Sequence, residues 1–308
     1  MKSRMIETKR GVRSRVFEAG SGAPLLFLHG AGGLFVENPF LDRLAERYHV
    51  FAPEFPGYGE SSGDELLEDM LDFALHGWDV VTALGLAQPY LIGHSMGGMI
   101  AAEMACLAPH DLAKLVLVAP AGLWVPEHPI PDIFSFLPHE FAQYLFYDRA
   151  QGEALLTGGL DLKNPEALSE FYIANSRRLS MAGKILFPIP NRRLSKRLYR
   201  LTAPTLLVWG KNDLLIPTVY AEYWKKLIPH AELSLIDKAA HMPPLRAARG
   251  VCDRSIPLSG LKGLKQIRPT LAEVWAHYLS TRDPHRRFSL RCGGLSRLKA
   301  NFPARELL

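Results

Sequence analysis

The chain has 308 residues, 48% of them hydrophobic, which is enough to bury a substantial core and predicts a folded globular protein. Its three cysteines, Cys106, Cys252 and Cys292, are too few and too scattered for a disulfide framework, and no Cys and His cluster has zinc-site spacing. The net charge of +5 comes from the end of the chain: residues 245–308 carry 13 Lys and Arg against 4 Asp and Glu, whereas residues 1–244 carry 23 against 27. A mildly acidic body without a nucleic-acid motif argues against a nucleic-acid partner.

The N-terminal segment, MKSRMIETKRGVRSR, is charged throughout and lacks the apolar stretch of a secretory signal. No apolar run approaches the ~18 residues that a membrane-spanning helix requires. We therefore expect a cytoplasmic protein without a membrane span.

Short apolar runs alternate with longer helical patterns. The runs are typical of strands buried on both faces, and they are APLLFLHG, YHVFAPE, PYLIGHS, KLVLVAP, TLLVWGKND and AELSLID. Residues 65–86 carry apolar side chains at roughly helical intervals, which predicts a helix between the second and third runs. This alternation predicts an α/β fold with a mostly parallel sheet covered by helices on both faces.

A glycine-rich loop, LHGAGG at residues 28–33, follows the first of these strands. We interpret the backbone N–H of Ala31 as one donor of an oxyanion hole, the set of donors that stabilises negative charge on a substrate oxygen. His29 and Gly30 belong to the same motif and are predicted to shape it. An ordinary glycine turn is the alternative interpretation.

The segment YLIGHSMGGMI places Ser95 between a strand and a largely apolar helix. The run Gly93-His94-Ser95-Met96-Gly97 matches the pattern G-x-S-x-G, in which the glycines permit a sharp turn that presents a nucleophilic serine. The N–H of Met96 is the second predicted oxyanion donor, and His94 is predicted to shape the turn. The flanking strand and helix argue against a chance Gly-Ser turn.

The alternation breaks after Val118. Residues 122–200 contain no convincing buried strand and combine prolines and aromatic residues with helix-like sequence. We predict that they form a helical insertion that covers the sheet as a cap.

Two polar residues follow the last two predicted strands. Asp213 ends the run VWGKND, and His241 lies in DKAAHMPP. A serine hydroxyl is a weak nucleophile that needs a base and a group that orients the base, and the chain order Ser, Asp, His fits His241 as base and Asp213 as orienting acid for Ser95. Asp237 is a competing acid, for which the end of a strand is the plainer interpretation.

In their order and spacing, the motifs LHGAGG, FPGYGESS, GHSMGG, VWGKND and AHMPPL make the chain resemble the α/β-hydrolase superfamily from about Arg15 to Leu245. The resemblance implies an eight-stranded, mostly parallel sheet, a helical cap between strands six and seven, and the triad Ser95, Asp213 and His241. It divides the chain into a core of residues 1–121 and 201–245 and a cap of residues 122–200. It implies no metal and no organic cofactor.

The expected function is that of a serine hydrolase that cleaves carboxylic esters with small to medium, apolar acyl or aromatic groups through an acyl-enzyme. The expected partner is a small-molecule ester; the sequence gives no oligomeric state. Serine at the turn argues against the relatives that use aspartate there, epoxide hydrolases and haloalkane dehalogenases.

Other activities stay open on the same triad: cleavage of carbon–carbon bonds in meta-cleavage products, cofactor-free peroxidase or perhydrolase chemistry, and thioester or lactone cleavage. Carbon–carbon bond hydrolases usually carry asparagine where this chain has His94. A non-catalytic ligand-binding protein of the same fold is the alternative from a different class.

The C-terminal segment departs from the superfamily pattern. Members commonly continue the histidine loop as His-x-Pro-x-x-Glu-x-Pro, whereas Arg246 and Ala248 stand at the glutamate and proline positions here. Residues 246–308 form an atypical basic tail, in which only residues 271–279, LAEVWAHYL, are typical of a helix that could dock on the sheet. A divergent extension and a shifted reading frame after Leu245 are the two explanations.

Overall fold

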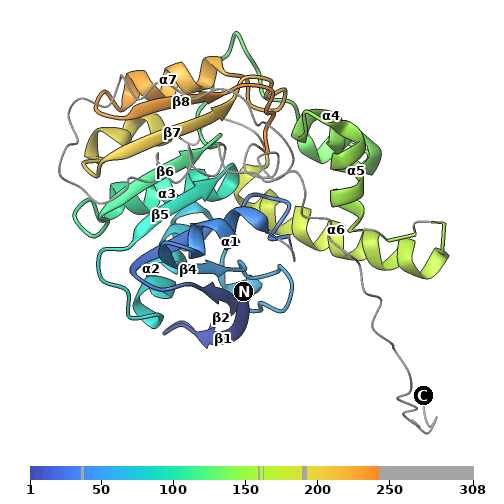
Figure 1. Cartoon of the computed structure of the whole chain (residues 1–308), viewed down its shortest axis with the longest axis horizontal. Coiled ribbons are helices and arrows are strands. Elements are labelled where there is room, and N and C mark those ends of the chain that lie inside the picture. Colours follow the sequence, from blue (N-terminus) through green and yellow to red (C-terminus); the bar gives the residue numbers. More distant parts are fainter. Residues whose placement is uncertain (36–37, 159, 162, 189–192, 243–308) are drawn as a thin grey trace, which may run out of the picture.

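A computed structural model describes residues 1–35, 38–158, 160–161, 163–188 and 193–242, which include one eight-stranded sheet (Figure 1). Its order is β1-β2-β4-β3-β5-β6-β7-β8, in which β1 and β2 are antiparallel and the neighbours from β4 to β8 are parallel. The strands are β1 (Lys2–Glu7), β2 (Arg13–Ala19), β3 (Ala23–Leu28), β4 (Tyr48–Pro53), β5 (Tyr90–His94), β6 (Lys114–Val118), β7 (Thr205–Gly210) and β8 (Glu232–Ile236). The predicted mostly parallel, eight-stranded sheet is confirmed.

Helices cover both faces of this sheet. Buried side chains of α2, α3 and α7 pack in one cluster on one face, and those of α1 pack in a second cluster on the other. The α-helices are α1 (Pro39–Ala45), α2 (Met70–Ala83), α3 (Met96–Leu107), α4 (Phe141–Leu145), α5 (Arg149–Thr157), α6 (Pro165–Leu186) and α7 (Val219–Leu227). Short 3-10 helices are η1 (Asp64–Leu66), η2 (Ile133–Ser135), η3 (Pro138–Glu140), η4 (Leu194–Lys196) and η5 (Leu198–Arg200).

The hairpin of β1 and β2 was not among the strands that the apolar runs predicted. In β1 only Ile6 is buried, and the other side chains of this edge strand are exposed. An edge strand with a solvated row of charged residues carries no apolar run, so hydrophobicity alone does not reveal it.

Helix α2 begins later than the predicted helix at residues 65–86. Asp69 caps it by accepting the N–H groups of Leu71 and Asp72, and the preceding residues form η1. The cap sets the phase of the helix, so that the apolar side chain of Leu71 is 52% exposed, while Leu67 is buried in the loop. The predicted start was therefore wrong by one turn and more.

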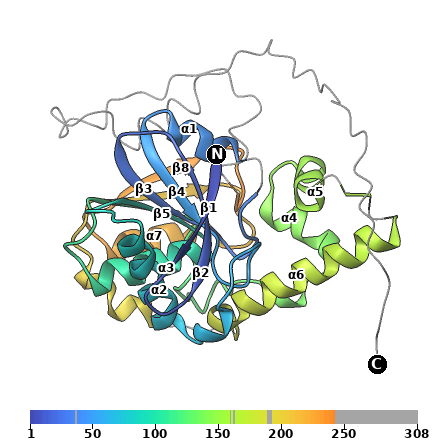
Figure 2. The same ribbon diagram turned by 90° about the horizontal axis from the view of Figure 1, so that it is seen from below.

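The chain between β6 and β7 contains α4, α5 and α6, and Figures 1 and 2 show these helices together on one side of the sheet, with α6 extending away from it. The Nζ of Lys184 on α6 donates to the carbonyl oxygens of Asp64 (2.6 Å) and Leu67 (2.9 Å). These bonds hold α6 against the loop that follows β4.

An ion pair holds the end of the insertion, where the chain returns to the sheet. The guanidinium of Arg197, at the junction of η4 and η5, binds the buried carboxylate of Glu103 on α3, with Nε to Oε2 at 2.7 Å. The Nε of Arg200 donates to the carbonyl of Cys106 (2.7 Å), whose thiol is buried and free. The pair fixes the geometry because the buried carboxylate of Glu103 would be costly to leave without a partner, while the side chain of Arg197 is partly exposed.

The tail at residues 246–308, with the expected helix at 271–279 and with Cys252 and Cys292, lies outside the described residues. Among the helices that the structure describes, none is both long enough and apolar enough to cross a membrane.

Candidate active site

Ser95 forms the turn between β5 and α3 in a backbone conformation that non-glycine residues seldom adopt, with φ 53° and ψ −115°. Three backbone hydrogen bonds hold it there: its N–H donates to Val118 (2.9 Å), and its carbonyl accepts from Met99 (3.1 Å) and Ala121 (3.0 Å). Strain of this kind persists only where the surroundings over-determine it, and it clusters at functional sites.

The glycines on either side of Ser95 are required by close backbone approach. A Cβ at Gly93 would collide with the carbonyl oxygen of Gly97, and a Cβ at Gly97 would collide with the carbonyl oxygens of Leu28 and His29. The glycine-rich loop after β3 therefore lies directly against the turn.

Ser95, His241 and Asp213 are joined in one chain of hydrogen bonds. The Nε2 of His241 lies 2.9 Å from the Oγ of Ser95, and the Nδ1–H of His241 donates to Oδ2 of Asp213 at 2.9 Å. All three side chains are buried. Because the carboxylate of Asp213 accepts the Nδ1–H, the proton of the neutral imidazole stays on Nδ1, and Nε2 is left as the acceptor that faces the serine hydroxyl.

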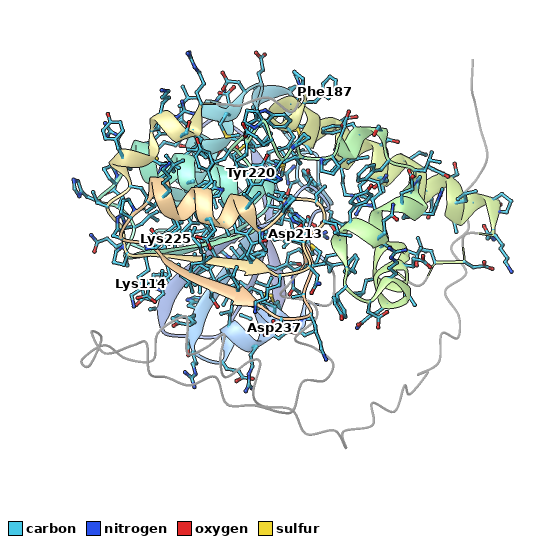
Figure 3. All side chains as sticks on the ribbon, turned by 90° about the horizontal axis from the view of Figure 1, so that it is seen from above. Lys114, Phe187, Asp213, Tyr220, Lys225 and Asp237 are labelled. Atoms are coloured by element: carbon cyan, nitrogen blue, oxygen red, sulfur yellow. The ribbon has the colours of Figure 1, made fainter. Side chains whose placement is uncertain are left out.

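Asp213 is itself held in place. Its Oδ1 accepts the N–H groups of Leu215 (2.9 Å) and Ile216 (2.8 Å), which leaves Oδ2 for His241. Asp237, the competing acid, has an 80% exposed side chain and pairs with Lys211 at 2.8 Å. Figure 3 shows the two aspartates at separate places.

His94 and His29 are buried, neutral and structural in this geometry. The Nε2–H of His94 donates to the backbone carbonyl of His241 (2.8 Å), so it ties the turn at Ser95 to the histidine loop. Burial lowers the pKa of His94 to about 3 and that of His29 to about 4. The roles of His94 and His29 in shaping the turn and the glycine-rich loop stay predictions.

The loop after β3 is oriented by His29. Its Nδ1–H donates to the carbonyl of Gly30 (2.7 Å), which also accepts the N–H of Gly33 (3.0 Å), and its Nε2 accepts the N–H of Phe55 (3.1 Å). In a planar trans peptide the C=O and the N–H point in opposite directions. The N–H of Ala31 therefore points away from the groups of His29 and Gly33 that donate to the carbonyl of Gly30. A Cβ at Gly30 would lie 3.3 Å from Cβ of Ser95, which places this peptide beside the serine.

Sequence reasoning missed Tyr58 and Arg178. The hydroxyl of Tyr58 lies 3.2 Å from the carbonyl of Ala31 and 3.1 Å from that of Arg178 on α6, and Nη1 of Arg178 donates to the carbonyl of Gly32 (3.2 Å). Burial raises the pKa of Tyr58, so the hydroxyl keeps its proton as a donor. The bond from Arg178 to Gly32 joins α6 to the glycine-rich loop across 146 residues of sequence, which no local pattern reveals.

Two cavities border this region. An apolar cavity of about 50 Å³ opens at Ser95 between α3 and the helices of the insertion. A larger one, of about 430 Å³, lies between α6 and the loops after β3 and β4, and Ser95 is not among its described lining residues. Within the described part of the chain, no group of three His, Cys, Asp or Glu side chains could hold a metal ion.

The chain is similar to known proteins both in sequence and in structure. The sequence model of the alpha/beta hydrolase family matches residues 25–254. Lipase 1 of Psychrobacter immobilis is 28% identical over 245 residues, which are 76% of this chain and 75% of that protein. The solved structure of a meta-cleavage product hydrolase from Pseudomonas fluorescens IP01 superposes with a TM-score of 0.65 at 19% identity, covering 80% of this chain and 93% of that one.

A further relative is longer. The dihydrolipoyllysine-residue acetyltransferase component of the acetoin cleaving system of Pseudomonas putida is 32% identical over 256 residues, which are 77% of this chain. The match spans 64% of that protein, less than two thirds of its length.

Proposed function

This chain belongs to the alpha/beta hydrolase family, and from that membership and the hydrogen bonds around Ser95 we propose that it is a carboxylesterase acting on esters with small to medium, apolar acyl or aromatic groups. The observation that carries the proposal is the continuous chain from Asp213 through His241 to Ser95, with both bonds at 2.9 Å. A cytoplasmic location stays a prediction.

In the proposed mechanism, Oγ of Ser95 attacks the ester carbonyl carbon while Nε2 of His241 takes the hydroxyl proton. Asp213 keeps the imidazole in the required tautomer and stabilises the imidazolium that forms. His241 then returns the proton to the leaving alcohol as the carbon–oxygen bond breaks. Water, activated by the same histidine, releases the acid from the acyl-enzyme.

The N–H groups of Ala31 and Met96 are the proposed oxyanion donors. Met96 is the first residue of α3, where N–H groups have no partner within the helix and the helix dipole favours negative charge. His29 sets the orientation of the peptide at Ala31, and this orientation supports the N–H of Ala31 as the other donor. Losing one such donor typically costs about 3 kcal/mol of transition-state stabilisation.

The insertion at residues 122–200 is proposed to act as a cap. Its apolar side chains border the cavity at Ser95, which supports an apolar acyl or aromatic substrate.

A hydrolysis panel tests the proposal. It contains nitrophenyl esters of increasing chain length, a lactone, a thioester, a meta-cleavage dienoate and emulsified long-chain triglyceride. We expect highest kcat/KM for short to medium nitrophenyl esters and no rise in rate at the oil–water interface, because the cap limits the space at Ser95. Faster turnover of the dienoate would assign carbon–carbon bond cleavage instead. A steep rise on emulsion would make the protein a lipase, and no turnover of any substrate would favour a non-catalytic binding protein.

A further inference from the structure

The cavity at Ser95 has a floor from the sheet side and a roof from the insertion. Met99 of α3, Ala121 after β6 and Ile216 after β7 form part of the floor, and Ile133, Phe134 and Ile185 form part of the roof. Among the described residues that line it, Ser95 carries the one polar side chain. A charged group in this space would lose its hydration without gaining a partner.

The proton path indicates which half of an ester enters this cavity. The leaving alcohol must receive its proton from Nε2 of His241, so the alcohol half lies on the side of His241. His241 is described by the structure and is not among the residues that line the cavity. The cavity therefore suits the other half of the ester, the acyl chain.

Its size limits that chain. Sites that enclose a whole drug-sized ligand measure about 300–1,000 Å³. At about 50 Å³ this space is several times smaller, so it suits only a short chain beyond the reacting carbonyl.

Met99 closes the floor one helical turn after the nucleophile, where its N–H donates to the carbonyl of Ser95. The side chain is fully buried and lies against Gly122, at which a Cβ would be only 2.7 Å from Cγ of Met99. Gly122 has φ 102°, a region that favours glycine. A side chain at residue 122 would be strained and would also collide with Met99, so the methionine side chain occupies this space.

We propose that this cavity is the acyl subsite, that it takes short, uncharged acyl chains, and that Met99 is the residue that sets the upper length. The inference rests on the proposed function, since it assigns one half of the ester. It further excludes acids with a second carboxylate on the acyl side, because the described lining offers no cation to pair with it.

The test compares Met99→Ala with Met104→Ala. Met104 lies on the same helix and is equally buried, but its Sδ faces Gly77 of α2 and not the cavity. Each protein is assayed on nitrophenyl acetate, butanoate, hexanoate, octanoate and decanoate, and on acetate esters of alcohols of the same lengths.

We expect the wild type to prefer butanoate. Met99→Ala should raise the ratio of kcat/KM for octanoate over butanoate by about tenfold or more, because a single methylene group in an apolar pocket can change kcat/KM by about that factor. The alcohol series should keep its profile in Met99→Ala, and Met104→Ala should keep both profiles. An unchanged acyl profile in a folded Met99→Ala, or a shift in the alcohol series, would overturn the assignment.

A binding measurement separates this inference from the proposed function. In alkylboronic acids, boron accepts an electron pair from Oγ of Ser95 and the alkyl group takes the place of the acyl chain, so calorimetry reports the subsite without turnover. We expect butylboronic acid to bind more tightly than octylboronic acid, with the order reversed in Met99→Ala. That result without ester hydrolysis would keep the subsite and refute the esterase; hydrolysis dependent on Ser95 with no chain-length preference would do the reverse.

A second variant guards against a Met99→Ala protein that does not fold. Ile133→Ala removes a roof residue from η2, which is only partly buried. It should shift the acyl profile in the same direction, and an unchanged profile in this variant would also count against the subsite.

Discussion

Replacing Ser95 by Ala, or His241 by Ala, is expected to lower kcat/KM for nitrophenyl butanoate by about a million-fold, and Asp213→Asn by about ten-thousand-fold. The members of such a unit depend on one another, so losing either the nucleophile or its base removes nearly all of their joint effect. Steady-state kinetics on purified variants measures the loss, and circular dichroism checks that each variant is folded.

Asparagine is the informative substitution at Asp213. It keeps Oδ1 as an acceptor for the N–H groups of Leu215 and Ile216 while it removes the charge that faces His241. The matched control is Asp237→Asn, which changes an exposed carboxylate near His241 in sequence. We expect wild-type kinetics for the control; if Ser95→Ala kept even about a tenth of the wild-type rate in a folded protein, the nucleophile would be misassigned.

Acidification from pH 7 to pH 5 is expected to lower the free energy of unfolding by about 6 kcal/mol through three buried histidines, about 2 kcal/mol each. Burial lowers the pKa of His29 and His76 to about 4 and that of His94 to about 3, whereas the unfolded chain has ordinary values near 6.5. The unfolded state thus binds protons first as the pH falls. The stability is present above about pH 6.5 and is lost as the pH falls towards 4.

Urea titrations at several pH values measure this effect, and the slope of the free energy against pH counts the protons taken up on unfolding. His76, which lies 3.4 Å from Oγ of Ser14 and away from the active site, allows a test by subtraction. His76→Asn should remove about one proton from the slope. A slope near zero in the wild type would mean that these histidines are not buried in neutral form.

Most of the strands and the residues of the candidate site were predictable because short local sequence patterns indicate them. Six of the strands are apolar runs, several of which end at glycine or a polar residue. The turn at Ser95 needs glycine at positions 93 and 97 because a Cβ at either position would collide with backbone carbonyl oxygens. Asp213 and His241 follow directly after strands, so their meeting at one edge of the sheet follows from parallel order.

The remaining features depend on contacts between distant segments. The hydroxyl of Tyr58 and the guanidinium of Arg178 join α6 to the glycine-rich loop. Tyr58 lies in the motif FPGYGESS, but that motif does not indicate its contact with α6. The edge hairpin of β1 and β2 lacks an apolar run, and the start of α2 is set by the cap at Asp69. Periodicity reports which residues are apolar, but not where a polar cap interrupts the helix.

Covalent labelling tests the central claim that Ser95 is a nucleophile activated by His241. In the reaction with diethyl 4-nitrophenyl phosphate, a bond forms between Oγ and phosphorus and nitrophenolate leaves. Mass spectrometry of the digested protein then locates the diethylphosphoryl group. The account predicts one group per chain, located on Ser95, with esterase activity lost in proportion and with labelling greatly slowed in His241→Ala. Labelling of another residue with activity lost in proportion, or full activity in a chain labelled at Ser95, would contradict it.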